Sequence, residues 1–473
     1  MFVGRVEELK KLEEMYRSKQ FEFAVIYGRR RIGKTTLIKE FIKNKKAIFF
    51  MAREADSSIN LAGFSNDVYG VVAKELAGNA QFSDWESALD FVARIAKRER
   101  IVLAIDEYPY LAGGFSPISS LLQAHIDQQF KDTRLFLILS GSSMSFMENQ
   151  VLAYKSPLYG RRTAQFKISP FSFFEALPFF EGFEAEDKAT LYGAVGGVPE
   201  YLSKLNSKRT VKQNIIELFL TPSGHFFEEP SNLLKQELRD PSTYNTIIEA
   251  IAYGASRLSE ISSKSGLESN KCGKYIKSLI ELGLVKKEVP VFETSSRKSI
   301  YRLDDFMFRF WYRFVFPNLS AIVSGLGNQV YEAEVRKNLS SYMGSPFEDI
   351  CKQFLVEEAK RGNLPFLLTS VGKWWGNNPL EKRQEEIDLL AYHETSALFV
   401  ECKWTNALVG ADALHDLEAQ SKMFAFANKW FLICAKRGFK QSLISGQQND
   451  DRLRLVTLMD MIDKVGKNVR NCL

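Results

Sequence analysis

Near its amino terminus the chain reads Phe23-Ala-Val-Ile-Tyr27 and then Gly28-Arg-Arg-Arg-Ile-Gly33-Lys34-Thr35-Thr36. The apolar run predicts a buried strand, and the run after it fits G-x-x-x-x-G-K-[ST] at the start of a helix. Glycines let successive backbone N–H groups turn towards a phosphate, and the positive end of the helix favours the same anion. A coincidental glycine-lysine turn is the alternative, but a predicted strand and a predicted helix flank the motif in register. We therefore predict a phosphate-binding loop for ATP, in which Thr35 also holds Mg²⁺ and the nucleotide is held by Gly28, Gly33, Lys34, Thr35 and Thr36.

Four apolar runs in the first part of the chain predict a parallel sheet. They lie at residues 23–27, 47–50, 101–105 and 135–139, and polar segments with helical periodicity separate them. Almost uninterrupted apolar runs suit strands that are buried on both faces, and the segments between them suit crossover helices. The expected fold class is α/β, with a parallel sheet covered by helices.

Polar residues follow two of these strands. The strand at 101–105 ends in Asp106 and Glu107, and we expect Asp106 to bind Mg²⁺ and Glu107 to polarise the water that attacks the γ-phosphate. A solvated turn is the alternative for this acidic pair. The strand at 135–139 ends in Ser140-Gly-Ser142, where Ser140 or Ser142 would sense the γ-phosphate unless these serines only form a turn.

An arginine pair follows in the stretch Tyr159-Gly160-Arg161-Arg162. Arg161 would stabilise the charge of the transition state, either in its own subunit or from a neighbouring one. A solvated surface arginine is the alternative.

Composition restricts the class of protein. The 473 residues carry a net charge of +6, and 45% are hydrophobic while 25% are charged, which excludes extended disorder. The length suggests about three domains. No apolar run is long enough to cross a bilayer, and the first residues lack the apolar core of a secretion signal, so we expect a cytoplasmic protein with no membrane partner. The five cysteines stand singly along the chain, which argues against a disulfide framework and a thiolate zinc site.

The middle of the chain predicts three helices and a β-hairpin. The helices are expected at residues 244–255, 258–266 and 269–282. Ser269 would cap the third helix and Gly283 would end it. Two β-like runs follow at 284–291 and 299–303, joined by residues 293–298. This order is that of a winged helix-turn-helix, in which the third helix enters the major groove of DNA.

The same region is basic. Residues 264–302 contain nine Lys or Arg and four Asp or Glu. Lys271, Lys274 and Lys277 recur at every third position of the third helix, which suits contacts with phosphates or base edges. We therefore expect DNA as a partner, with a protein–protein spacer that carries solvated lysines as the alternative.

Acidic residues and a lysine form a second constellation near the carboxyl end. Residues 386–391 and 398–404 predict two paired strands, so Glu401 and Lys403 share one strand face and Asp388 lies on the neighbouring strand. Glu348 lies on a preceding amphipathic helix. The three carboxylates would hold Mg²⁺ or Mn²⁺, with Asp388 and Glu401 as the direct ligands, and Lys403 would orient or activate water. Charged strand ends without a metal are the alternative.

The amino-terminal motifs together resemble the archaeal-type ATPase family, a branch of the P-loop ATPases close to the AAA+ and STAND groups. The resemblance covers roughly the first 230 residues and rests also on Phe2-Val3-Gly4-Arg5, Leu158-Tyr-Gly-Arg161 and Gly196-Gly197-Val-Pro199. It implies a parallel sheet of the P-loop ASCE type, with Gly4 and Arg5 near the adenine and Pro199 in a helical lid over the nucleotide. From the residues alone, the second segment predicts only a helix-breaking turn.

The carboxyl-terminal constellation resembles the PD-(D/E)xK nuclease fold in its restriction-endonuclease-like form, over about residues 335–450. Carried over by position, Asp388, Glu401 and Lys403 match the nuclease core and Glu348 matches its helix acid, whereas Ile387 replaces the proline before the aspartate. The region also resembles a carboxyl-terminal domain of uncharacterised function that accompanies many archaeal-type ATPases, and Lys373-Trp374-Trp375-Gly376 adds to that likeness. Gln420, on a helix expected at 411–427, would be an additional polar site residue.

These observations predict an ATPase core at residues 1–168, a helical lid at 169–238, a winged helix at 239–316 and a nuclease-like domain at 317–473. ATP hydrolysis would be coupled to DNA binding and to metal-dependent DNA cleavage, in a chain that forms a homo-oligomer. The alternatives are a nucleotide-dependent switch whose last domain binds without cleaving, and a regulator that binds duplex DNA with little ATP turnover.

Overall fold

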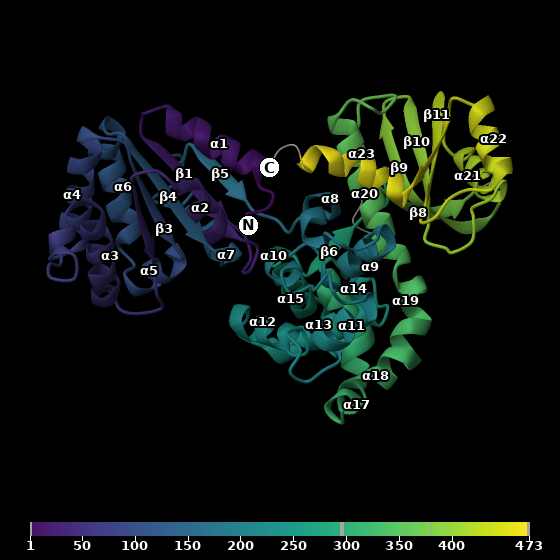
Figure 1. Cartoon of the computed structure of the whole chain (residues 1–473), viewed down its shortest axis with the longest axis horizontal. Helices are drawn as coiled ribbons and strands as arrows, with labels where there is room; N and C mark the ends of the chain where they lie inside the picture. The colour runs from purple at the N-terminus through teal and green to yellow at the C-terminus, as the bar shows by residue number, and fades with distance from the viewer. Residues whose placement is uncertain (1, 294–297, 380, 471–473) are drawn as a thin grey trace. The chain divides into compact units, whose positions relative to one another are not determined.

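The computed structural model describes residues 2–293, 298–379 and 381–470. The chain divides into two compact units, Met1–Pro170 and Phe171–Leu473, which are described separately (Figure 1). The expected boundaries inside the second unit stay predictions.

The first unit contains a five-stranded sheet in which all neighbouring strands are parallel. In spatial order its strands are β2 (Ala47–Met51), β3 (Ile101–Asp106), β4 (Leu135–Gly141), β1 (Glu22–Tyr27) and β5 (Ala164–Lys167). The predicted parallel α/β sheet is therefore confirmed. Strand β5 was not foreseen because it lies at an edge and alternates between half-buried and exposed residues, so it contains no apolar run.

Helices cover both faces of this sheet. They are α1 (Val6–Arg17), α2 (Lys34–Ile42), α3 (Ser57–Val72), α4 (Trp85–Arg98), α5 (Tyr108–Gly114), α6 (Ile118–Gln128) and the short α7 (Met144–Phe146). Alternate residues of β1 enter two separate cores: Phe23 packs with residues of α3, α4 and α6, whereas Ala24 packs with residues of α1 and α2. Burial on both faces explains why the strands read as continuous apolar runs.

The second unit begins with helices. They are α8 (Phe173–Ala176), α9 (Ala185–Val195), α10 (Pro199–Leu202), α11 (Val211–Phe219), α12 (Glu229–Glu237), α13 (Pro241–Ala252), α14 (Leu258–Ser265) and α15 (Ser269–Glu281). Strand β6 (Val285–Glu288) then pairs antiparallel with β7 (Ile300–Leu303). The three helices and two strands expected here are present in the predicted order, but residues 294–297 of the expected turn lie outside the described residues.

The predicted cap at the amino end of the third helix, α15, is wrong. Ser269 is the first residue of α15 rather than its cap, and its hydroxyl donates to the hydroxyl of Ser262 instead of accepting a bond from the helix. Gly266 and Gly283 adopt left-handed conformations, with φ of 68° and 69°, where helices α14 and α15 end. These are the positions at which glycine ends a helix without a Cβ penalty.

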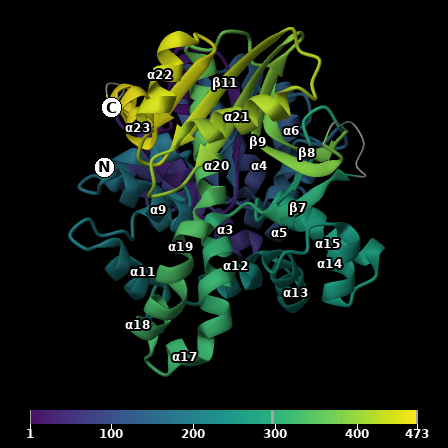
Figure 2. The ribbon, with the colours of Figure 1, turned by 90° about the vertical axis from the view of Figure 1, so that its right-hand side faces the viewer.

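A run of helices leads to the last sheet. It consists of α16 (Phe306–Phe310), α17 (Leu319–Val323), α18 (Gly327–Val330), α19 (Arg336–Tyr342) and α20 (Gly344–Lys360). Figure 2 shows α19 and α20 leading from the helical region to the carboxyl-terminal sheet. The sheet has the order β12 (Leu453–Thr457), β11 (Asn428–Ala435), β10 (Ser396–Lys403), β9 (Arg383–His393) and β8 (Ser370–Asn378).

This second sheet is mixed. Strands β8, β9 and β10 form an antiparallel meander, and β11 and β12 run parallel to β10. The remaining helices are α21 (Ala411–Ser421), α22 (Gln441–Asn449) and α23 (Leu458–Arg470). The predicted hairpin of β9 and β10 is confirmed, and α21 ends at Ser421 rather than near residue 427.

One hydrophobic core extends from the helices of the second unit to one set of residues in its sheet, and a separate core contains Ile387 and Phe399. The first core includes Leu191 of α9, Ile276 of α15, Phe310 of α16, Phe354 of α20 and Leu432 of β11. The segments predicted as lid, winged helix and nuclease-like domain therefore share buried apolar surface. A substitution in the core of one segment would alter the packing of the others.

Candidate functional site

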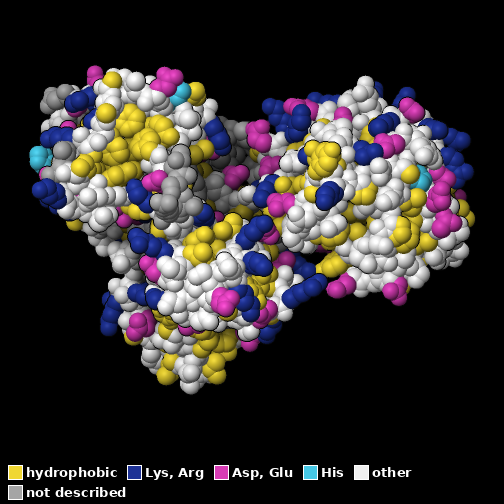
Figure 3. Space-filling model, turned by 180° about the vertical axis from the view of Figure 1, so that it is seen from behind, with side chains coloured by type: hydrophobic (Ala, Val, Ile, Leu, Met, Phe, Trp, Pro, Cys, Tyr) yellow, Lys and Arg dark blue, Asp and Glu magenta, His cyan; other side chains and the backbone are white. Residues whose placement is uncertain are grey.

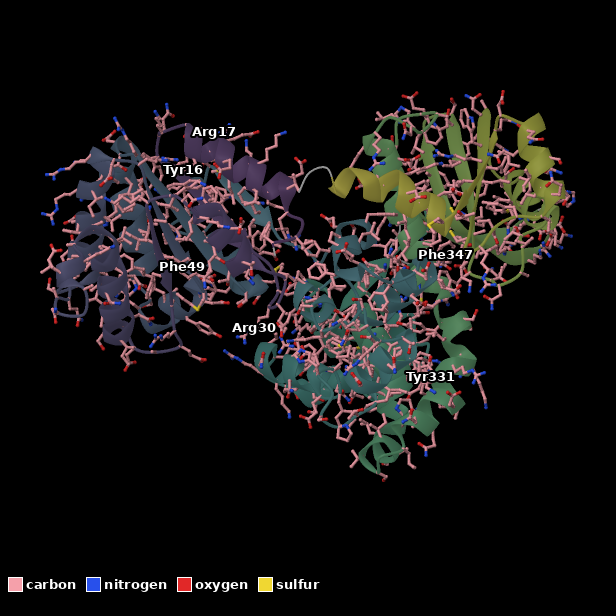
Figure 4. All side chains as sticks on the ribbon, viewed as in Figure 1. Tyr16, Arg17, Arg30, Phe49, Tyr331 and Phe347 are labelled. Carbon is pink, nitrogen blue, oxygen red and sulfur yellow. The ribbon has the colours of Figure 1, made fainter. Side chains whose placement is uncertain are left out.

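The phosphate loop joins β1 to α2. Gly28 has φ of 157°, and a Cβ there would lie 2.4 Å from the carbonyl oxygen of Ile168. Gly33 has φ of 86° and is the residue before α2. Lys34 is 5% exposed, and its ammonium donates a 3.0 Å hydrogen bond to the carbonyl oxygen of Arg29, so the loop wraps around this side chain. Arg30, labelled in Figure 4, donates from the same loop to the hydroxyl of Tyr110, 2.6 Å away.

The structure brings Thr35 and Asp106 together. Thr35 Oγ1 donates a 2.6 Å hydrogen bond to Asp106 Oδ2, while Asp106 Oδ1 accepts from the backbone N–H of Glu107 at 3.1 Å. Asp106 is fully buried. The two residues meet because β1 and β3 are parallel and end at the same edge of the sheet. A hydroxyl and a carboxylate are hard oxygen donors, so this pair fits Mg²⁺.

The two serines at the end of β4 differ in their surroundings, since Ser140 lies within the strand and Ser142 follows it. Ser142 Oγ donates a 2.7 Å hydrogen bond to Glu107 Oε2, and the backbone N–H of Ser142 donates to the same oxygen at 3.3 Å. Ser140 is fully buried, and its hydroxyl has no hydrogen-bond partner among the described residues. Contact of Ser140 with a γ-phosphate stays a prediction.

Arg161 is not brought to the phosphate loop of its own unit. Its guanidinium donates to both carboxylate oxygens of Asp127, at 3.1 and 3.0 Å from Nε. The backbone N–H of Thr163 donates to the carbonyl oxygen of Phe23, at the amino end of β1, whereas the phosphate loop follows the carboxyl end of that strand. A role of Arg161 within its own subunit therefore lacks the necessary geometry, and a role from a neighbouring copy stays a prediction.

Arg5 ties the phosphate loop to the end of the first unit. Gly4 and Arg5 both have positive φ, of 70° and 59°. Arg5 Nη2 donates to the carbonyl oxygen of Ile32 at 3.3 Å and to that of Ser169 at 2.6 Å. The segment thus lies beside the loop, and contact with adenine stays a prediction.

The glycine pair before Pro199 fixes the start of the second unit. The backbone N–H of Phe171 donates to the carbonyl oxygen of Gly197 at 2.7 Å. A Cβ on Gly197 would lie 1.8 Å from the carbonyl oxygen of Phe171, so this close approach requires glycine. Pro199 is the first residue of α10, and its place in a nucleotide lid stays a prediction.

In the second unit, the structure brings the predicted acids near one another. Asp388 Oδ2 accepts a 2.8 Å hydrogen bond from the backbone N–H of Cys402, the residue after Glu401. Burial raises the pKa of Glu348 to about 7, the Lys373 charge opposes that rise, and the Asp388 charge adds to it. Burial, and then the Asp388 charge, also raise the pKa of Glu401. The three carboxylates therefore share one electrostatic environment that favours a cation.

Lysines occupy this cluster in the structure. Lys403 Nζ pairs with Glu401, while Lys373 Nζ pairs with Glu348 and, at 3.0 Å, with Glu386. Among the described residues, no three His, Cys, Asp or Glu side chains form a ready metal cluster. The carboxylate oxygens have the chemistry that Mg²⁺ or Mn²⁺ requires, but a divalent ion would have to displace an ammonium group.

Sequence patterns did not reveal the role of Lys373. This residue stood out only through a resemblance, although it is the lysine that pairs with Glu348.

Cys351, Cys402 and Cys434 stand far apart in sequence, yet their thiols lie within hydrogen-bonding reach of one another. No local signal reveals this cluster, because the thiols come from α20, β10 and β11.

Gln420, the additional polar residue expected at this site, donates from Nε2 to the carbonyl oxygen of Glu386 at 3.3 Å.

The basic surface is smaller than the sequence count suggests. Lys271, Lys274 and Lys277 are exposed on α15. Lys286 instead pairs with Asp304 at 3.1 Å and Asp349 at 3.2 Å, and Arg302 pairs with Asp349 at 3.0 Å. Although burial raises the pKa of Asp349, the charges of Arg302 and Lys286 hold it below its usual value. On the face seen in Figure 3, basic side chains are scattered among acidic ones.

The segment after β6 packs on the carboxyl-terminal sheet. Val291 is 7% exposed and belongs to the core that includes Ile387 and Phe399. The ring of Phe292 lies 4.3 Å from that of Tyr392 and 5.6 Å from that of Phe426. Val291 is therefore turned towards protein, whereas Phe292 packs on the sheet and is still 42% exposed. Among the described residues, the exposed lysines of this region include those of α15, Lys264 of α14 and Lys287 of β6.

No helix among the described residues is both long and apolar enough to span a membrane.

Two family models match the chain. Residues 2–205 match the model described as an ATPase domain predominantly from Archaea, and residues 311–420 match the model described as archaea bacterial proteins of unknown function. The resemblance of the amino-terminal region to archaeal-type ATPases is thereby confirmed. The winged helix and the nuclease-like domain stay predictions.

Individual proteins match as well. The chain is 36% identical over 469 residues to the uncharacterized protein MJECL04 of Methanocaldococcus jannaschii, covering 96% of this chain and 98% of that protein. A segment of 46 residues is 52% identical to the uncharacterized ATP-binding protein MJ0423 of the same organism, over 10% of this chain and 78% of that protein.

Solved structures give weaker likenesses. The chain is similar to the Walker-type ATPase PABY2304 of Pyrococcus abyssi, with a TM-score of 0.49 and 18% identity over 66% of this chain and 96% of that one. It is similar to the ORC2 protein of Aeropyrum pernix with a TM-score of 0.43 and 14% identity, over 69% and 94% of the two chains.

Proposed function

The chain belongs to the same family as the uncharacterized protein MJECL04 of Methanocaldococcus jannaschii, and its residues 2–205 match an ATPase domain found predominantly in Archaea. We propose that it hydrolyses ATP at the phosphate loop and uses nucleotide state to control an action on DNA. The observation that carries the ATPase part is the 2.6 Å hydrogen bond from Thr35 to Asp106, beside the buried Lys34. These residues join the amino end of α2 to the carboxyl end of β3, where a triphosphate and its metal ion are held together in P-loop enzymes.

Each residue has a defined task in this proposal. Lys34 neutralises charge on the β- and γ-phosphates, and the backbone N–H groups of the loop bind phosphate oxygens. Thr35 and Asp106 would hold Mg²⁺, which supplies positive charge to the phosphate oxygens when bound. Glu107 accepts the proton of the attacking water.

Nucleotide binding tests this part directly. The affinity of the purified chain for a fluorescent ATP analogue is measured with Mg²⁺ and with EDTA, for the wild type, Lys34→Ala and Asp106→Asn. We expect Lys34→Ala to weaken binding at least about tenfold, since a charge-assisted contact is lost. Asp106→Asn should weaken binding only when Mg²⁺ is present. Equal affinities of all three proteins would refute the proposal.

The DNA part rests on α15. Its three lysines, Lys271, Lys274 and Lys277, are exposed, and among the described residues their one ion pair is the 3.8 Å approach of Lys277 to Glu281. Exposed lysines on one helix suit phosphate contacts along duplex DNA. DNA is therefore the partner that this surface supports.

A second candidate function is metal-dependent cleavage of a phosphodiester. The raised pKa values of Glu348, Asp388 and Glu401 favour it, because buried like charges of this kind are stabilised by a bound cation. Lys403 would then contact the phosphate or the attacking water. The competing account is a domain that binds DNA or protein without cleaving it.

Metal binding separates the two accounts. Mn²⁺ binding is measured by calorimetry for the wild type and Asp388→Asn, and cleavage of linear, circular and single-stranded DNA is followed with Mn²⁺ and ATP. A nuclease should bind Mn²⁺, lose it in Asp388→Asn and cut at least one DNA. A chain that binds no Mn²⁺ and leaves every DNA intact is not a nuclease.

A homo-oligomer is the remaining part of the proposal. Arg161 lies away from the phosphate loop of its own unit. In a homo-oligomer, Arg161 of one subunit would instead reach the nucleotide bound to a neighbouring subunit. The mass of the particle, measured by light scattering with and without an ATP analogue, tests this.

A further inference from the structure

Two hydrogen bonds hold Ser142 against the carboxylate of Glu107. Ser142 is 4% exposed, and both its hydroxyl and its backbone N–H donate to the same oxygen, Glu107 Oε2, at 2.7 and 3.3 Å. Among the described residues, none donates a hydrogen bond to Oε1 of this carboxylate. The two oxygens of Glu107 therefore have different roles available to them: one is fixed and the other remains able to accept a proton.

The backbone around this contact is strained and tightly packed. Glu107 has φ of 51° and ψ of 44°, a left-handed conformation that is unfavourable for a residue with a Cβ. A Cβ on Gly141 would lie 2.6 Å from Met147 Sδ and 2.8 Å from Pro109 Cδ. The end of β4 is thus pressed against the start of α5, which brings Ser142 to Glu107. Strain that the surrounding structure maintains is characteristic of functional positions.

We propose that Ser142 is a positioning residue for ATP hydrolysis, which fixes Glu107 Oε2 so that Oε1 receives the proton of the attacking water. This inference rests on the proposed ATPase function. It gives Ser142 a task other than γ-phosphate sensing, since its hydroxyl proton is already donated to Glu107.

The step balances as follows. The water oxygen forms a bond to the γ-phosphorus, and its proton passes to Glu107 Oε1. The bond between the γ-phosphorus and the β,γ-bridging oxygen breaks, and its electron pair stays on the ADP that leaves. Ser142 exchanges no proton, so its contribution is the orientation of the carboxylate.

The test is a set of steady-state measurements of ATP hydrolysis on the full chain. Ser142→Ala removes the hydroxyl, Ser142→Thr keeps it, and Ser143→Ala is the matched control, because Ser143 caps no helix through its side chain. We expect Ser142→Ala to lower kcat at least about tenfold, because a hydrogen bond to a charged group is lost. KM for ATP should stay within about twofold, as expected when only transition-state contacts are lost. Ser142→Thr and Ser143→Ala should remain within about threefold of the wild type.

A double-mutant cycle shows whether the effect passes through Glu107. In a Glu107→Gln background, Ser142→Ala should cause no further loss of kcat, because the base that it orients is already gone. Independent, multiplying losses would overturn the inference. So would an unchanged kcat in Ser142→Ala, or a raised KM with unchanged kcat, which would indicate a contact with the nucleotide itself.

Failure of this inference is distinguishable from failure of the ATPase proposal. If the wild type hydrolyses ATP and Ser142→Ala hydrolyses it equally fast, only the inference about Ser142 fails. If the wild type neither binds nor hydrolyses ATP, the proposed function itself fails.

Discussion

The backbone N–H of Val291 donates a 2.9 Å hydrogen bond to the carbonyl oxygen of Lys373. Val291 follows β6, and Lys373 is the residue of β8 whose ammonium pairs with Glu348 and Glu386. The segment predicted to form the wing of a DNA-binding motif is therefore bonded to the strand that carries a lysine of the acidic cluster. In this arrangement the hairpin acts as a structural link within the second unit, and the three lysines of α15 remain exposed.

Removing the buried contact of Val291 should destabilise the second unit. Val291→Ala loses two methyl groups from a packed core, so we expect the free energy of unfolding to fall by about 2 kcal/mol. Val289→Ala is the matched control, because Val289 is 43% exposed whereas Val291 is 7% exposed. Denaturant unfolding followed by tryptophan fluorescence measures both. An equal, negligible effect of the two changes would show that the packing of Val291 is unimportant.

Lysines of α15 should dominate binding to duplex DNA. For the triple variant Lys271→Ala/Lys274→Ala/Lys277→Ala, we expect affinity to fall and the slope of log K against log [salt] to decrease by about 0.9 for each lost phosphate contact. Lys337→Ala is the control, because Lys337 is exposed on α19. Fluorescence anisotropy at several salt concentrations provides the measurement. A salt slope that the triple variant leaves unchanged would contradict DNA contact through α15.

Stability should depend on pH through Glu348. Its pKa is raised from 4.5 to about 7, chiefly by burial, so the folded state holds the proton more tightly than the unfolded state does. Below pH 4.5 both states are protonated and no penalty applies. As the pH rises to about 7, the unfolded state alone gains from ionisation, so the free energy of unfolding should fall, by roughly 3 kcal/mol for a shift of this size.

The variant Glu348→Gln isolates this contribution. It carries no titrating carboxyl, so its stability should change less than that of the wild type between pH 4.5 and 7. Urea unfolding across this pH range measures the difference. Parallel pH profiles of the two proteins would mean that Glu348 titrates normally.

Hydrogen bonds of Arg5 should stabilise the phosphate loop. Arg5→Ala removes hydrogen bonds to the carbonyl oxygens of Ile32 and Ser169, so we expect weaker ATP binding and a loss of about 2 kcal/mol in stability. Arg17→Ala is the control, because Arg17 is an exposed arginine of α1. Calorimetric titration and thermal unfolding test both effects. Equal ATP affinities and equal thermal stabilities of Arg5→Ala and Arg17→Ala would show that these hydrogen bonds contribute to neither property.

The sequence predicted those features that local chemistry determines. The phosphate loop, the strand before it and the acids at the end of β3 are read from apolar runs and glycine spacing, and the structure places Thr35 and Asp106 in contact. The pairing of β9 with β10 also followed from local pattern, and it brings Asp388 close to Glu401.

Features set by tertiary register were not predictable in this way. Lys373 reaches Glu348 only because β8 pairs with β9, and the packing of Val291 depends on a strand that lies far away in sequence. The count of basic residues overestimated the exposed charge, because it could not show that Lys286 and Arg302 pair with Asp349. Arg161 was linked to the nucleotide by its place in a motif, whereas its own hydrogen bonds hold it to Asp127.

The release of phosphate from ATP by the purified full chain tests the central claim most directly. With Mg²⁺ present, the wild type should release phosphate at a steady rate. Glu107→Gln should bind ATP as the wild type does but release phosphate at least about a hundredfold more slowly, because the proton acceptor is lost. Chelation of Mg²⁺ should stop the wild-type reaction. No Mg²⁺-dependent release by the wild type, or equal rates for the wild type and Glu107→Gln, would contradict the account.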